Sequence, residues 1–227
     1  MDTRTPAPDH SPWLPFESRR RARDEKRDAV LRTAVQLFLE QGYHRATLNE
    51  VADRLNITKP ALYNYFRSKE DILFECWTNG QERVEDRIAE IETAGENGLA
   101  TLRMLVRAYA TIMASDFGAS LVRFNVADLS EANQKTTLTG KRRIDRAFRN
   151  AIKRGIADGS IAPCDVKLTA FAILGALNWI GHWYKPGGEL SPDQIADDFA
   201  IRLTADIAKR SRKKTPEKKA AKPVRKK

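Results

Sequence analysis

The sequence is poor in the residues that bind metals or form disulfides. Its 227 residues include only two cysteines and three histidines. Cys76 and Cys164 lie far apart and belong to no CxxC or Cys/His spacing. The sequence therefore predicts neither a zinc site nor a disulfide framework and implies no cofactor. We interpret both cysteines as reduced core thiols.

The motifs of common hydrolases and nucleotide-binding enzymes are also missing. The sequence contains no HExxH, no GxSxG and no glycine-rich phosphate loop. Its histidines, His10, His44 and His182, fall in an N-terminal arm, a short loop and an apolar segment, and they form no catalytic set. We therefore predict that the protein is not an enzyme.

Long apolar runs are absent as well. The longest apolar segment, residues 168–184, is interrupted by Asn178 and His182 and is shorter than the roughly 20 residues that a membrane span needs. The first residues lack the basic region and apolar run of a signal peptide. The sequence predicts a cytoplasmic protein without a membrane partner.

Positive charge is abundant but unevenly distributed. The formal net charge is +10, and residues 209–227 hold eleven lysines and arginines against one glutamate. The residues before this tail therefore sum to zero. Within them, residues 19–71 carry twelve basic and eight acidic groups, a local excess that is typical of nucleic-acid-binding surfaces.

Residues 47–69 have the pattern of two short helices joined by a tight turn. Thr47 and Glu50 have the spacing of an N-terminal capping box, and apolar residues then recur on one helical face. Asn56 tolerates a left-handed backbone and ends this helix, and Thr58 caps the next one. The pattern predicts a helix-turn-helix whose second helix enters the major groove of DNA.

The outward side chains of the second helix are of the kinds that contact DNA. A cation, a methyl group and hydrogen-bonding groups suit phosphates, thymine methyls and base edges. The candidate DNA-binding residues are Thr47, Thr58, Lys59, Ala61, Tyr63, Asn64, Tyr65 and Lys69. A generic helical hairpin is the alternative, but packing alone explains poorly two exposed tyrosines flanked by cations.

Residues 27–75 resemble the N-terminal DNA-binding domain of TetR/AcrR-type transcriptional regulators. The similarity lies in Gly-Tyr at 42–43, Ala-Leu-Tyr-x-x-Phe at 61–66 and Ser-Lys-Glu at 68–70. Asn56 departs from the family pattern, in which glycine is common. The resemblance implies a regulator that pairs two such domains in a homodimer.

Helical periodicity continues along the chain without strand alternation. The predicted fold class is all-α, with an N-terminal three-helix helix-turn-helix domain and a C-terminal helical ligand-binding and dimerisation domain. We predict a first helix from about Arg23 to Gly42, a long helix from Ser68 to about Gly95, and helices over 99–115, 121–129, 131–158, 166–184 and 191–208.

The last two predicted helices have apolar faces that need a partner. Gly175, Ala176 and Gly181 permit close approach of the 166–184 helix, and apolar residues recur every four positions in 191–208. Helix-turn-helix proteins read two half-sites about 34–36 Å apart, so we infer a homodimeric four-helix interface. Packing of both faces within one subunit is the alternative.

Two features bear on the effector. Arg142, Arg149 and Lys153 form with Arg146 a basic stripe that would suit the phosphates of an acyl-CoA, although a solvated face has the same pattern. Residues 177–192 resemble the corresponding segment of TetR-type regulators of fatty-acid, sterol-fragment and other acyl-CoA catabolism. The candidate effector-binding residues are Tyr109, Met113, Arg123, Asn125, Arg146, Asn178, Trp179, His182 and Trp183. For the last four, packing in the core or interface is the alternative.

The sequence thus predicts a DNA-binding regulator, most simply a repressor, that binds a palindromic operator as a homodimer and is released by a small-molecule effector such as an acyl-CoA. We divide the chain into a flexible arm (1–18), a helix-turn-helix domain (19–71), a ligand-binding and dimerisation domain (72–208) and a disordered basic tail (209–227). The tail supports an alternative, an architectural or nucleoid-associated DNA-binding protein.

Overall fold

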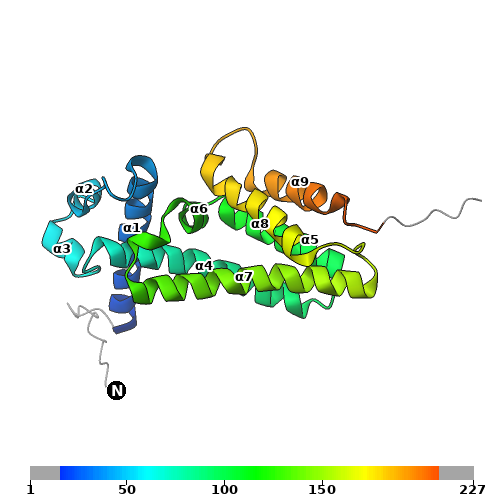
Figure 1. The fold of residues 1–227 in the computed structure, drawn as a ribbon. Coiled ribbons are helices and arrows are strands. Elements are labelled where there is room, and N and C mark those ends of the chain that lie inside the picture. Colours follow the sequence, from blue (N-terminus) through cyan, green and yellow to red (C-terminus); the bar gives the residue numbers. More distant parts are fainter. Residues whose placement is uncertain (1–15, 210–227) are drawn as a thin grey trace, which may run out of the picture.

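The computed structural model describes residues 16–209, and the secondary-structure elements of this range are all helices (Figure 1). The helices are α1 (Phe16–Gln41), α2 (Leu48–Arg54), α3 (Lys59–Tyr63), α4 (Lys69–Thr93), α5 (Gly98–Met113), α6 (Asp116–Arg123), α7 (Glu131–Asp158), α8 (Val166–Trp183) and α9 (Pro192–Ala205), with a short 3-10 turn, η1 (Val126–Asp128), before α7. The predicted all-α fold class is confirmed. Most of the predicted arm and nearly all of the basic tail lie outside the described residues.

The first helix begins earlier than the sequence predicted. α1 starts at Phe16, whereas the apolar pattern predicted a start near Arg23. Residues 17–29 are mostly arginine, lysine, glutamate, aspartate and alanine. Several of these are strong helix formers, so a helix extends through them without a buried face.

The prediction of a helix over 121–129 was wrong. α6 begins at Asp116, because the Ser115 hydroxyl caps it by accepting a hydrogen bond from the Gly118 N–H at 3.2 Å. The helix ends at Arg123, where the chain becomes extended and then forms η1. The periodicity analysis assigned Ser115 to the preceding helix and so missed its capping role.

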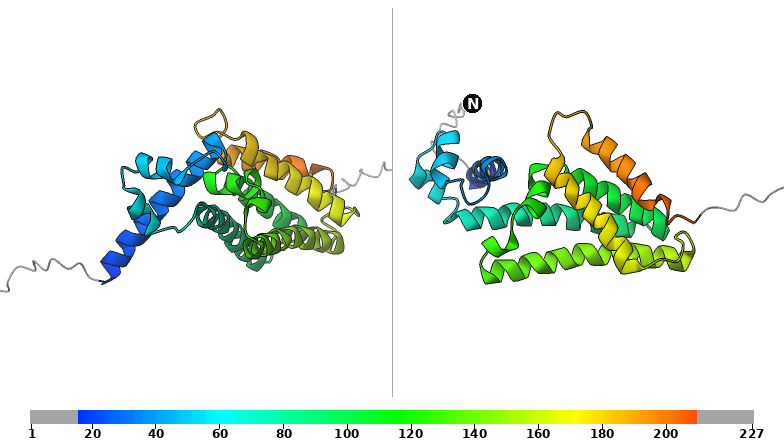
Figure 2. Two further views of the ribbon diagram at one scale, coloured as in Figure 1. Left: turned by 60° about the vertical axis from the view of Figure 1, so that its left-hand side comes forward. Right: turned by 45° about the horizontal axis from the view of Figure 1, so that its top comes forward.

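Apolar side chains form two cores that share one helix. The head core joins α1, α2 and α3 to the start of α4, and the body core joins the rest of α4 to α5–α9. α4 gives Leu73 and Cys76 to the head core, and Val84 and Ile91 to the body core. In Figures 1 and 2, α4 runs from the head into the body beside α7. A displacement of α4 would therefore move the head relative to the body.

α5 lies at the centre of the body and packs against α4, α7, α8 and α9. It crosses α7 at two glycines, where a Cβ on Gly98 would lie 2.3 Å from the Gly155 Cα. After α9 the chain is held to the α7–α8 connection, since the Lys209 N–H donates to the Ser160 carbonyl at 3.1 Å. The described chain thus ends at the end of the body that is far from the head (Figure 1).

Candidate functional site

The two helices of the head are set by their caps and by the turn between them. The Thr47 hydroxyl accepts a hydrogen bond from the Glu50 N–H at 3.3 Å, and the Glu50 carboxylate accepts one from the Thr47 N–H at 2.7 Å. The predicted capping box is confirmed, and the hydrogen bonds from Thr47 lower the pKa of Glu50. Asn56 has a left-handed backbone with φ 52°, as predicted. α2 and α3 form a helix-turn-helix.

Most of the residues that the sequence analysis assigned to DNA contact are exposed on the helix-turn-helix. Leu62 is buried and fixes the orientation of α3, and the Thr58 hydroxyl accepts a hydrogen bond from the Ala61 N–H at 3.3 Å. Of the predicted set, Thr47, Thr58, Lys59, Tyr63 and Asn64 are exposed, and Ala61, Tyr65 and Lys69 are half-buried. The exposed members offer one cation and several hydrogen-bonding groups to a partner.

Two cations, one at the start of α3 and one shortly after its end, have no acidic partner among the described residues. Among residues 17–209, neither Lys59 nor Arg67 takes part in an ion pair. Unpaired surface cations beside an exposed helix attract phosphates without first losing an intramolecular partner. This part of the head has the charge that DNA binding requires.

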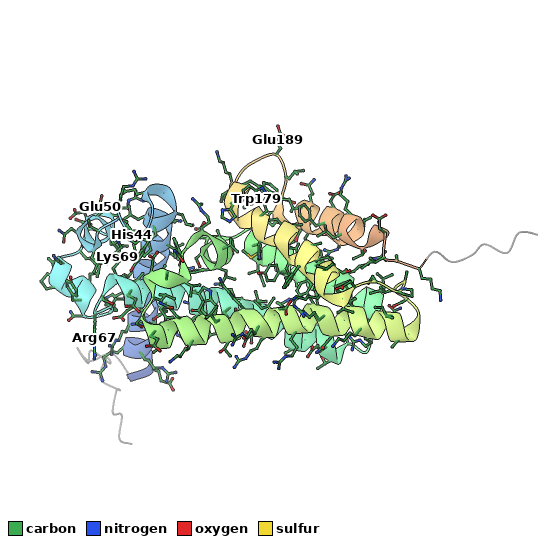
Figure 3. The ribbon with its side chains drawn as sticks, viewed as in Figure 1. His44, Glu50, Arg67, Lys69, Trp179 and Glu189 are labelled. Carbon is green, nitrogen blue, oxygen red and sulfur yellow. The ribbon has the colours of Figure 1, made fainter. Side chains whose placement is uncertain are left out.

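Lys69 is engaged inside the head. Its Nζ donates a hydrogen bond to the His44 carbonyl at 3.2 Å and lies 4.4 Å from the centre of the Tyr43 ring. Burial lowers the pKa of Lys69, while Asp128 opposes that shift. Figure 3 places Lys69 beside His44, with Arg67 on the other side of the head. In this arrangement Lys69 holds the α1–α2 connection, and its contact with a phosphate stays a prediction.

The sequence analysis missed Arg27, which clamps the end of α3. Its Nη1 donates a hydrogen bond to the Tyr65 carbonyl at 2.6 Å, its Nε donates to the Glu75 carboxylate at 2.8 Å, and its guanidinium lies 4.3 Å from the Phe66 ring centre. Arg27 therefore ties α1, the end of α3 and α4 together. No local pattern distinguishes it from the other arginines of α1.

Arg27→Met should reduce operator affinity about fivefold, because methionine keeps the packing on Phe66 but loses the hydrogen bond that positions α3. Titration of the variant against operator DNA measures this change, and circular dichroism checks that the helix content is unchanged. Arg32→Met is the matched control, since Arg32 pairs only with exposed Asp28 on the same helix. Equal affinities of the two variants would contradict the clamp.

The body contains a cleft between α5, α6, α7 and α8 with a volume of about 330 Å³. The Tyr109 hydroxyl and the Asn178 side chain meet there, with the hydroxyl donating to the amide oxygen at 2.8 Å. Burial raises the pKa of Tyr109, so its hydroxyl stays a neutral donor. The residues that line the cleft are Tyr109, Leu121, Val122, Lys141, Ile144, Leu174 and Asn178. The structure therefore brings together two of the predicted effector-binding residues.

Lys141 is the cation of this cleft, and the sequence analysis did not select it. The residue is exposed, but partial burial of its amine lowers the pKa of Lys141, and it forms no ion pair within the described part of the chain. The predicted stripe lies elsewhere on α7: Arg146 is exposed and does not line the cleft, and Arg149 donates to the Asp145 carboxylate. Lys141 immediately precedes Arg142, the first residue of the predicted basic stripe.

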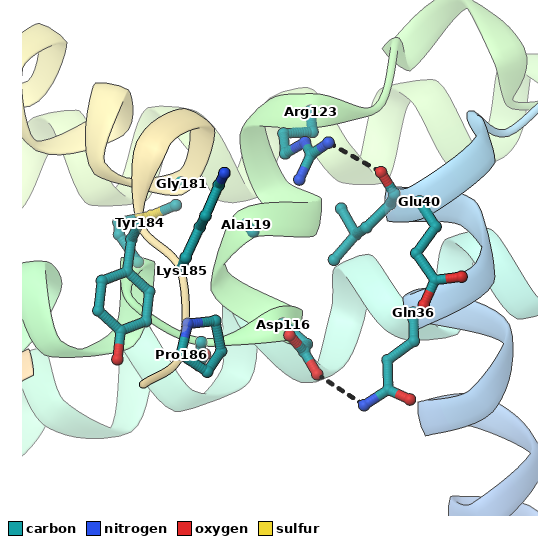
Figure 4. A pocket seen from close by; sticks show the side chains of 12 residues that line it. Gln36, Glu40, Asp116, Ala119, Arg123, Gly181, Tyr184, Lys185 and Pro186 are labelled. Carbon is teal, nitrogen blue, oxygen red and sulfur yellow. Dashed lines mark hydrogen bonds between the residues drawn. The ribbon is translucent and has the colours of Figure 1, made fainter. Parts of the chain in front are cut away.

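A second cavity, of about 420 Å³, lies between the head and the body (Figure 4). It contains two further predicted residues, Met113, which is fully buried, and Arg123, whose Nη2 donates to the Leu39 carbonyl at 2.8 Å. Asn125 lines neither of these two cavities. Its side chain caps η1 by accepting a hydrogen bond from the Ala127 N–H at 3.0 Å. These three residues do not join the Tyr109–Asn178 pair.

The remaining predicted residues lie on the outer face of α8. Trp179, His182 and Trp183 are exposed, and the Trp179 and His182 rings stack at 4.9 Å. Although Asn178 and His182 are four residues apart, Asn178 reaches the cleft and His182 does not line it. Trp179 and Trp183 do not line the cleft either, so none of these three predicted residues joins the Tyr109–Asn178 pair.

A helix-turn-helix head on a helical body defines a DNA-binding transcriptional regulator. Residues 30–76 match the family described as bacterial regulatory proteins, tetR family, and residues 95–206 match the tetracyclin repressor-like C-terminal domain. The HTH-type transcriptional repressor KstR2 of Rhodococcus jostii is 30% identical over 181 residues, which cover 77% of this chain and 87% of that protein. The chain belongs to the TetR family.

Solved structures have the same fold. KstR2 of Mycobacterium tuberculosis superposes with a TM-score of 0.76 at 23% identity, covering 82% of this chain and 96% of that one. AibR in complex with isovaleryl coenzyme A and operator DNA gives a TM-score of 0.68 at 26% identity, covering 77% and 96%. KstR2 is described as a transcriptional regulator, and AibR was solved on operator DNA. Within residues 16–209, none of the helices has the length and apolar character to cross a membrane.

Proposed function

We propose that this TetR-family protein is a homodimeric repressor that binds a palindromic operator and is released by an acyl-CoA. The observation that carries the effector hypothesis is the cleft that holds the Tyr109–Asn178 pair beside the unpaired cation Lys141. The apolar walls suit an acyl chain, the polar pair suits a thioester carbonyl, and the cation suits a phosphate. A cytoplasmic location agrees with such a ligand.

The size of the cleft favours a short acyl group. About 330 Å³ is near the lower end of the roughly 300–1,000 Å³ of small-molecule sites. A cavity of this volume holds a small acyl chain, while the bulky coenzyme remains at the mouth. The structural similarity to AibR, which was solved with isovaleryl coenzyme A, supports a short branched or linear chain.

The homodimer is supported by the outer face of α8. Leu168, Phe171 and Trp179 are more than half exposed, as is Ile201 on α9. The apolar residues that recur every four positions in α9 instead pack against the body core of the same subunit. A Cβ on Gly175 would meet no atom within 4 Å, so no contact inside the subunit requires glycine at that position. An exposed apolar face of this extent is typical of a protein interface. Two copies would pack α8 and α9 into four helices and pair their heads on DNA.

Titration of acyl-CoAs of increasing chain length against the protein–operator complex tests the effector hypothesis. We expect short acyl-CoAs to release the DNA, and free coenzyme A or the free acids to be weaker. If no chain length releases the operator, the acyl-CoA hypothesis is wrong, and the DNA-binding function is unaffected.

Lys141→Met should weaken the response to acyl-CoA about tenfold, because the variant loses one charge-assisted contact to the coenzyme phosphates while keeping the apolar stem. The measurement is the acyl-CoA concentration that half-releases a fluorescent operator. Arg142→Met is the matched control, since Arg142 is exposed on the same helix and does not line the cleft. A normal response of the Lys141 variant would place the phosphates elsewhere.

The basic tail is the basis of the architectural alternative. Footprinting of the full chain and of a chain that lacks residues 213–227 separates the two functions. A short palindromic protection that survives the deletion supports the repressor. Loss of all binding supports an architectural protein whose tail binds phosphates without sequence preference.

A further inference from the structure

Three buried polar atoms at the contact of α4 and α7 make no hydrogen bond to any described residue. They are the indole nitrogen of Trp77, the side-chain oxygen of Gln81 and the hydroxyl oxygen of Thr137. All three residues are more than nine-tenths buried. A buried polar group without a partner destabilises the fold, and such groups in native proteins are usually satisfied by ordered water or a ligand. This α4–α7 polar site is separate from the cleft at Tyr109.

The orientation of the Gln81 amide is set by its neighbours. Its Nε2 donates a hydrogen bond to the Glu85 carboxylate at 2.7 Å, and Arg143 of α7 donates to the same carboxylate at 3.2 Å. The reversed amide would place its oxygen against a carboxylate, which is repulsive. The Gln81 oxygen is therefore held in the position where it has no partner, and it can only accept a hydrogen bond.

Thr137 differs from the other threonines of its helix. The hydroxyls of Thr136 and Thr139 donate to the carbonyls of Ala132 and Lys135, one turn earlier. The Thr137 hydroxyl makes no such bond, although it is fully buried. It is therefore available to a guest between the helices.

Gly140 brings α7 against the same two side chains of α4. A Cβ on Gly140 would lie 2.7 Å from the Trp77 ring and 2.8 Å from the Gln81 side-chain carbon. Gly140 thus lets α7 pack directly against Trp77 and Gln81, one turn from Thr137. A guest of more than a few atoms does not fit in so close a contact.

We propose that this α4–α7 polar site binds one ordered water molecule. The guest must accept a hydrogen bond from the Trp77 N–H and donate one to the Gln81 oxygen. A hydroxyl does both, whereas a carbonyl or ether cannot donate and an ammonium group cannot accept. Thr137 can serve as donor or acceptor, so it completes the three contacts that buried waters typically make.

The position of this site gives it a role in coupling the body to the head. Trp77 lies two turns into α4, the helix that shares both cores. At the start of α4, the Glu70 carboxylate accepts hydrogen bonds from the Ser130 N–H at 2.7 Å and from Asn133 of α7 at 2.9 Å. A guest that joins α4 to α7 therefore acts on the same pair of helices that determine the position of the head relative to the body.

Thr137→Val tests the proposal through the sign of its effect on stability. The variant keeps the shape of threonine and removes only the hydroxyl. If a guest bonds to that hydroxyl, the folding equilibrium constant of the ligand-free full-length protein should fall about fivefold in denaturant unfolding. If no guest is present, removal of an unsatisfied hydroxyl should raise it, which would overturn the proposal. Thr136→Val is the matched control on the exposed face of the same helix.

A crystal structure of the full-length protein without effector identifies the guest. An ordered oxygen within hydrogen-bonding distance of all three groups supports water. An oxygen that appears only with 3-hydroxybutyryl-CoA, and not with butyryl-CoA or without effector, would be a hydroxyl of the effector and would overturn the proposal of a resident water. Direct hydrogen bonds among the three side chains, with no oxygen between them, would overturn the proposal. The unfolding test uses no effector, so its result is independent of the acyl-CoA hypothesis.

Discussion

Trp179→Glu should convert the protein from a dimer to a monomer at micromolar concentration. Trp179 is 63% exposed in the single subunit, so its replacement costs the fold little. In the proposed four-helix interface, the two subunits would bury both introduced glutamates without partners. Each buried charge costs several kcal/mol. We expect the dimer dissociation constant to rise by at least about a thousandfold, and operator affinity to fall by about a hundredfold or more because one head reads only half of a palindrome.

Sedimentation velocity measures the dimer, and a mobility shift on operator DNA measures the consequence. Leu138→Glu is the matched control, because Leu138 is a large apolar residue of α7 that is 43% exposed and lies outside the α8–α9 face. The control should remain dimeric. A Trp179 variant that also remains dimeric would show that the subunits pair through another surface.

Tyr63→Ala should weaken operator binding about a hundredfold while leaving the dimer intact. Tyr63 is 43% exposed at the end of α3, where it contributes ring and hydroxyl to the surface but little to the head core. Loss of one tyrosine contact costs about 1–1.5 kcal/mol of binding free energy. A symmetrical dimer loses this contact in both heads, so the total cost is about 2–3 kcal/mol. Binding to nonspecific DNA should change less, since it depends on cations such as Lys59.

Fluorescence anisotropy on operator and on scrambled DNA measures both affinities, and Tyr63→Phe separates the two parts of the side chain. If the hydroxyl bonds to a phosphate or a base, the phenylalanine variant loses most of the affinity. If the ring packs on a thymine methyl or sugar, it loses little. An alanine variant that unfolds or dissociates would show that Tyr63 belongs to the structural part of the head.

The described chain ends far from the helix-turn-helix. Lys209 is held at the end of the body that is far from α3. Deletion of residues 213–227 should therefore leave the operator contacts of α3 unchanged.

The head could be predicted from the sequence because its determinants are local. The capping box of Thr47 and Glu50, the left-handed Asn56 and the cap at Thr58 each depend on residues within four positions of one another. Exposure of Tyr63 follows from the period of a helix whose buried member is Leu62. The half-burial of Tyr65 and the internal contacts of Lys69 depend on α1 and α4, so no local pattern could give them.

The helices of the body were predicted from the sequence, but the packing of these helices decides which residues meet at each site. Tyr109 and Asn178 are 69 positions apart, and only the approach of α5 to α8 makes them partners. A turn of about 100° between neighbouring helical positions decides that Lys141 lines the cleft and Arg142 does not. The sequence by itself determined the helical fold, the reading head and the family, because short-range backbone chemistry and periodicity specify them. Tertiary structure alone decided the cleft, the Arg27 clamp and the α4–α7 polar site, because each requires side chains that only the packing of distant helices brings together.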